Sequence, residues 1–127
     1  MTAEGYARDA VAHLLRVFAR NVRRTATGPT PDTVHDLRVS IRRLSQALRV
    51  FDAQFPPNRV RRRLRGLRQL AGGVRDLDIA IEQANRRRWK VALDGARSVA
   101  ASRLQAKAER LRKKKSWDKW SRRLGIA

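Results

Sequence analysis

The segment from Val34 to Phe51 most constrains the fold, because its apolar and basic residues separate onto two adjoining arcs of a helix. At about 100° per residue, the basic arc spans about 60°. It holds His35, Arg38, Arg42 and Arg49. The adjoining arc carries apolar side chains, namely Val34, Leu37, Ile41, Leu44, Leu48 and Phe51. Such a helix suits an anion bound beside a hydrophobic core. The plainer alternative is a basic face that is only solvated, and the pattern alone favours this alternative.

The composition points to a partner of high negative charge. The chain has 127 residues, of which 42% are hydrophobic, so it fits one domain with a modest core. Its 31 Lys and Arg against 11 Asp and Glu give a formal net charge of +20. Of these basic residues 25 are Arg, whose planar guanidinium makes two parallel hydrogen bonds to phosphate oxygens. We therefore expect a phosphate-rich polyanion.

Several classes of protein are excluded or disfavoured by the same composition. There is no cysteine, which excludes disulfides, thiol catalysis and thiolate metal sites. No apolar run approaches the roughly 20 residues that span a bilayer, and the first residues lack the pattern of a signal peptide. We expect a cytoplasmic protein that does not bind membranes.

Helical periodicity, interrupted by proline and glycine, extends along the chain. Thr25–Pro31 and Pro56-Pro57 interrupt it, and Gly72-Gly73 is expected to stop or kink a helix. Asp32 or Thr33 is the expected cap of the second helix, and Gly95 is expected to weaken the start of the last long one. The predicted helices cover residues 3–24, 32–54, 58–71, 74–84 and 89–115, with a final turn capped by Ser116.

No segment has the period of a strand. Four main helices joined by short turns predict an all-α fold, an antiparallel four-helix bundle with short extra helical segments. We expect residues 1–127 to form a single domain.

Two sequence blocks resemble the signatures of the CHAD family, the conserved histidine α-helical domain. The first is residues 34–51, which begins Val34-His35-Asp36-Leu37-Arg38, and the second is residues 67–79, which ends Val74-Arg75-Asp76-Leu77-Asp78-Ile79. The resemblance implies two similar helical bundles around a basic cleft, binding of inorganic polyphosphate and association with polyphosphate granules. This chain has one His-x-x-Arg block and corresponds to half of that domain. It either forms a homodimer that recreates the cleft, which we favour because two-fold dimers are the commonest oligomers, or is a degenerate half-domain.

The candidate polyphosphate-binding residues lie at helical spacing on several helices. Arg75 is included because it is expected near the amino end of a short helix, and Arg43 because it flanks the basic arc. A plainer role for Arg38 and Arg42 is to pair with Asp36, Asp76 or Asp78. The full candidate set is His35, Arg38, Arg42, Arg43, Arg49, Arg61, Arg65, Arg68, Arg75, Arg103, Lys107 and Arg110.

Two other functions compete with polyphosphate binding. Nonspecific nucleic-acid binding is consistent with the charge, although only 6% of residues are aromatic and no known recognition motif is present. Catalysis on a phosphate polymer usually needs a carboxylate-held metal, and the chain has no Walker loop and no acidic cluster on one helix face. We expect a non-catalytic protein without a metal or cofactor.

Overall fold

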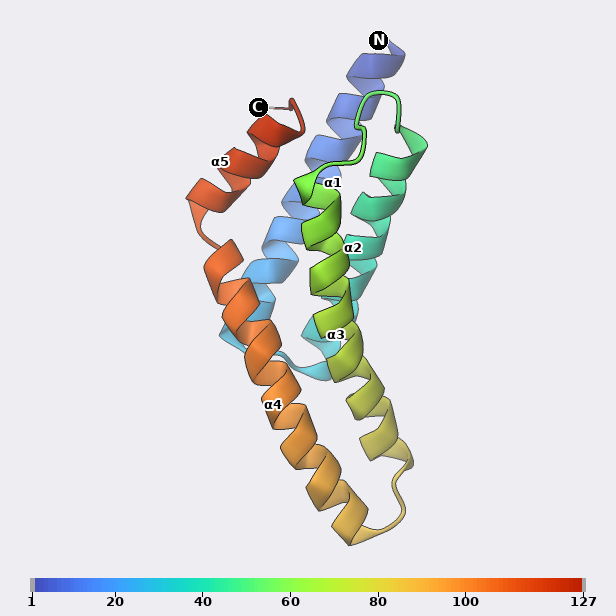
Figure 1. The fold of residues 1–127 in the computed structure, drawn as a ribbon, viewed down its shortest axis with the longest axis vertical. Coiled ribbons are helices and arrows are strands. Elements are labelled where there is room, and N and C mark those ends of the chain that lie inside the picture. The colour runs from blue at the N-terminus through green and yellow to red at the C-terminus, as the bar shows by residue number, and fades with distance from the viewer. Residues whose placement is uncertain (1, 127) are drawn as a thin grey trace.

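The computed structural model describes residues 2–126, which form five helices and no strand. Four long helices, α1 (Ala3–Thr27), α2 (Pro31–Val50), α3 (Arg59–Gln83) and α4 (Arg87–Leu111), are followed by the short α5 (Lys114–Arg123). Successive long helices run in opposite directions, and α1 packs against α2 and α4 while α3 packs against the same two (Figure 1). The predicted antiparallel four-helix bundle is confirmed.

Capping side chains fix where three of the helices begin. The Thr2 hydroxyl accepts a hydrogen bond from the Gly5 amide at 2.9 Å. Thr30 and Thr33 cap α2 reciprocally, with Pro31 at the first helical position, so the cap lies two to three residues before the predicted one. Asn58, at the predicted start of this helix, caps α3 by accepting from the Val60 amide at 2.9 Å.

Several predicted boundaries are wrong. The helix α3 continues through Gly72 and Gly73, where the sequence predicted a break, because each glycine costs only about 1 kcal/mol in a helix and the helix is anchored by buried neighbours. Gly95 likewise does not delay α4, which begins at Arg87, because a single helical glycine costs only about 1 kcal/mol. Ser116 lies inside α5 and does not cap it, and α2 ends at Val50 before a turn.

One hydrophobic core runs through the bundle and draws on all five helices. Its α2 side is the predicted apolar arc, in which Val34, Leu37 and Ile41 are almost completely buried. The aromatic residues Phe18 and Trp120 stack at 5.6 Å between ring centroids and attach α5 to α1. The core side chains of α2 and α3 hold these two helices side by side, so that the cations along their shared edge face one groove.

The far half of the α3–α4 hairpin extends beyond the bundle (Figure 1). No residue from Arg75 to Ala100 is buried. Trp89, Val91 and Val99 are 47%, 62% and 54% exposed. None of the helices described is long and apolar enough to cross a bilayer.

Candidate functional site

A basic groove runs between α2 and α3. Its α2 wall consists of the predicted basic arc, with Ser45, Gln46 and Val39 between the charged side chains. The arc points away from the buried face because the two patterns lie on adjoining sides of the same helix. The cations on this wall are His35, Arg38, Arg42 and Arg49.

The α3 wall of the groove carries Arg61, Arg65 and Arg68, which lie within about 60° of one another on the helix. Arg68 borders both the His35 half of the groove and the Arg61 half, as do Ser45 and Arg49. The two halves therefore form one continuous surface, which we call the α2–α3 groove. Six arginines and one histidine line it.

The lining of the α2–α3 groove contains no Asp or Glu. The acids that might have neutralised it pair elsewhere: Asp36 binds Arg24 at 2.8 Å, and Asp78 binds Arg97 at 2.6 Å. Among the described residues, neither Arg38 nor Arg42 forms an ion pair, so the alternative in which they pair with nearby acids does not hold. The Arg38 Nε is shielded from solvent without a hydrogen-bond partner. Unpaired cations beside a core create a strong local preference for an anion.

Arg61 differs from its neighbours because the protein already occupies its guanidinium. Its Nη2 donates to the Phe55 carbonyl at 2.7 Å, to the Leu48 carbonyl and to the Asp52 carboxylate at 3.0 Å. These bonds join the start of α3 to the turn after α2. Arg61 therefore positions the groove wall, whereas Arg38, Arg42, Arg49, Arg65 and Arg68 keep free donors.

The other predicted site residues lie outside the α2–α3 groove. Arg43 borders a separate depression on the α1 side, together with Arg20, Arg24 and Asp36. Arg75 is half-buried inside α3, so its expected position near a helix amino end is wrong. Asp78 on α3 orients Arg97 on α4 through an ion pair of 2.6 Å.

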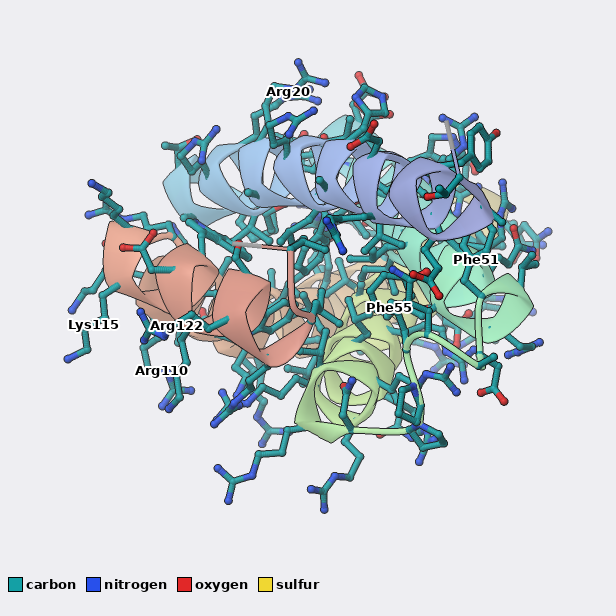
Figure 2. All side chains as sticks on the ribbon, turned by 90° about the horizontal axis from the view of Figure 1, so that it is seen from above. Arg20, Phe51, Phe55, Arg110, Lys115 and Arg122 are labelled. Atoms are coloured by element: carbon teal, nitrogen blue, oxygen red, sulfur yellow. The ribbon has the colours of Figure 1, made fainter. Side chains whose placement is uncertain are left out.

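The three candidates on α4 do not face α2. Lys107 borders an open depression on the opposite flank of α3, together with Arg59, Arg62, Arg63 and Gly66. Arg103 and Arg110 lie within about 60° of Lys107 on α4 and are exposed. Figure 2 shows Arg110 and Arg122 projecting to the same side of the molecule.

Sequence reasoning missed the polar and basic residues whose role depends on tertiary packing. Ser45 and Gln46 line the α2–α3 groove, and their places within about 80° of His35 on α2 are the only signal that could have found them. The cations Arg59, Arg63, Lys119 and Arg123 gather on the other flank of α3. Their proximity depends on how α5 folds back, which no spacing within one helix indicates.

Within residues 2–126 no three His, Cys, Asp or Glu side chains gather as metal ligands. The chemistry that the α2–α3 groove supports is multiple charge-assisted hydrogen bonding to anionic oxygens, in which each guanidinium donates and none accepts.

One of three comparisons with known proteins gives a match. Searches of curated proteins and of solved structures found no match to the chain. A family model described as the CHAD domain matches residues 9–124, which includes both signature blocks, most of α1 and all of α2, α3 and α4. The chain therefore belongs to the CHAD domain family.

Proposed function

We propose that this protein binds inorganic polyphosphate in the α2–α3 groove and does not catalyse a reaction on it. The observation that carries the proposal is a groove lined by six arginines and one histidine without any carboxylate. The CHAD family is associated with polyphosphate binding, which favours this polyanion over others.

The spacing of the groove cations suits a bare phosphate chain. Residues three and four apart on a helix lie about 5–6 Å from each other, so α2 and α3 present two rows of closely spaced donors. A polyphosphate offers charged oxygens along its whole length and no bases to stack. Guanidinium groups from both walls can then bind successive phosphates from two sides.

The test is a titration of labelled long-chain polyphosphate with a double variant, Arg38→Ala with Arg42→Ala. We expect the dissociation constant to rise at least a hundredfold, because each lost charge-assisted contact costs on the order of 1.5–3 kcal/mol. A double variant that folds and binds like the wild type would show that the groove is not the site. Release of orthophosphate from the polymer on addition of Mg²⁺ would contradict the non-catalytic role.

We further propose that two copies associate through the exposed half of the α3–α4 hairpin. Val91 and Val99 lie within about 80° of each other on the outer face of α4 and are more than half exposed. A dimer there would extend the groove from its His35 end, since α3 passes the start of α2 before it enters the hairpin (Figure 1). The net charge of +20 opposes association, so we expect dimers when polyphosphate or high salt screens it.

Light scattering with polyphosphate present tests the dimer. We expect Val91→Glu with Val99→Glu to give monomers, whereas Val50→Glu, at a position on α2 that is 75% exposed, serves as the control and leaves the dimer intact. A wild-type protein that stays monomeric at all protein concentrations, with polyphosphate present, would contradict the proposed dimer. Granule association would follow from the binding of long polymers and is tested by imaging the tagged protein with a polyphosphate stain.

A further inference from the structure

Arginines surround the solvent side of the first half of α3. Relative to Leu64 at zero, Arg68, Arg61 and Arg65 lie between about 40° and 100°, on the wall of the α2–α3 groove. Arg62 lies at about 160°, directly opposite the buried face. Arg59 and Arg63 continue around to the other flank of the helix, next to α4 and α5. The basic surface of α3 is thus continuous from one flank to the other.

The second flank carries its own group of cations from three helices, which we call the second basic patch. It consists of Arg59, Arg62 and Arg63 from α3, Lys107 from α4, and Lys119 and Arg123 from α5. None of these six residues forms an ion pair among the residues that the structure describes. Folding therefore gathers like charges here without a protein counter-charge.

Mutual repulsion in the second basic patch contributes to the lowered pKa values of two of its members, Lys119 and Arg123. Repulsion from Arg123 is the largest of the causes that lower the pKa of the Lys119 ammonium. Loss of solvent, followed by repulsion from Arg59 and Arg63, lowers the pKa of Arg123. The Nη1 of Arg123 is shielded from solvent and has no hydrogen-bond partner. A bound anion would relieve the repulsion and accept from this orphaned donor.

We propose that the second basic patch is a second phosphate-binding site, and that a long polyphosphate bound in the α2–α3 groove crosses the outer face of α3 over Arg62 to reach it. The chemistry favours phosphate because guanidinium groups dominate the patch and present forked donors. The path around half of the helix is roughly 17 Å for a helix about 11 Å wide. Tripolyphosphate is too short to engage both sites in full, whereas a long polymer links them and gains from the high effective concentration of its second segment.

This inference rests on the proposed function for the path of the long polymer, but the second site can be tested by itself. Calorimetric titration with tripolyphosphate measures the number of sites, and Arg59→Ala with Arg63→Ala removes the patch. Arg8→Ala with Arg20→Ala removes the same charge from exposed positions on α1, outside the groove, the patch and the hairpin, and serves as the control. Both substituted positions on α3 are helical and tolerate alanine, and circular dichroism checks the fold. Lys119→Ala, at an exposed position, is a second variant that perturbs the patch alone.

We expect two tripolyphosphate sites per chain in the wild type and in the control, and one in the patch variant. Long-chain polyphosphate should bind the patch variant at least tenfold more weakly than the control. The inference is overturned if the wild type has one site, or if the patch variant matches the control with both ligands. The two proposals fail separately. If long-chain polyphosphate binding is lost in the patch variant but not in Arg38→Ala with Arg42→Ala, the groove is not a binding site, whereas the second basic patch is.

Discussion

Replacement of Arg68 by alanine is the most informative single change, because Arg68 is one of three residues that border both halves of the α2–α3 groove. Its side chain is exposed and forms no ion pair among the described residues, so the substitution removes ligand contacts and little else. A charge-assisted hydrogen bond contributes about 1.5–3 kcal/mol, and the exposed position favours the lower end of that range. About 1.5 kcal/mol corresponds to roughly a tenfold rise in the dissociation constant.

Salt dependence separates a direct phosphate contact from a general effect of charge. Each phosphate of a single-stranded nucleic acid that a protein neutralises contributes about 0.7 to the slope of log affinity against log salt concentration. Anisotropy titrations of labelled long-chain polyphosphate at several salt concentrations should therefore show Arg68→Ala with a slope smaller by about that amount. Arg20→Ala is the matched control, because Arg20 projects from α1 on the side away from α3 (Figure 2). Equal losses of affinity and equal slopes in the two variants would refute a specific role for the groove.

Two further predictions concern the fold that holds the groove together. Gly72→Ala and Gly73→Ala should each raise the free energy of unfolding, measured by urea denaturation, by about 0.5–1 kcal/mol. Both sites are helical, and an added Cβ meets no atom within 4 Å. A loss of stability would indicate that α3 needs flexibility at these positions. Phe18→Ala should lower the free energy of unfolding by about 3–5 kcal/mol, because Phe18 is fully buried between α1 and the tryptophans of α5. A change below about 1 kcal/mol would mean that α5 is not firmly docked.

The fold was largely predictable because apolar periodicity and proline breaks set the number and direction of the helices. The inward stripe of α1 was not, since two adjacent stripes are both apolar. Tyr6, on one of these stripes, is 61% exposed, whereas the neighbouring stripe through Val11 and Leu15 is buried. Packing of α1 against α2 and α4 determines which of two stripes one residue apart is buried.

The candidate site was predictable within each helix but not between helices. The arc from His35 to Arg49 follows from the period of α2 alone, and the structure places it on one wall of the groove. That Lys107 faces the opposite flank of α3 depends on the order in which the helices pack. The capture of Arg61 by two backbone carbonyls depends on the turn after α2, whose conformation leaves no periodic signal.

A competition titration near physiological salt tests the central claim most directly. Labelled long-chain polyphosphate is bound to the purified protein and challenged with single-stranded RNA and with duplex DNA at matched phosphate concentration. If the groove is built for a bare phosphate chain, polyphosphate stays bound when either nucleic acid is in excess. If nucleic acid displaces it at equal phosphate concentration, the protein is a general polyanion binder and the α2–α3 groove is not specific for polyphosphate.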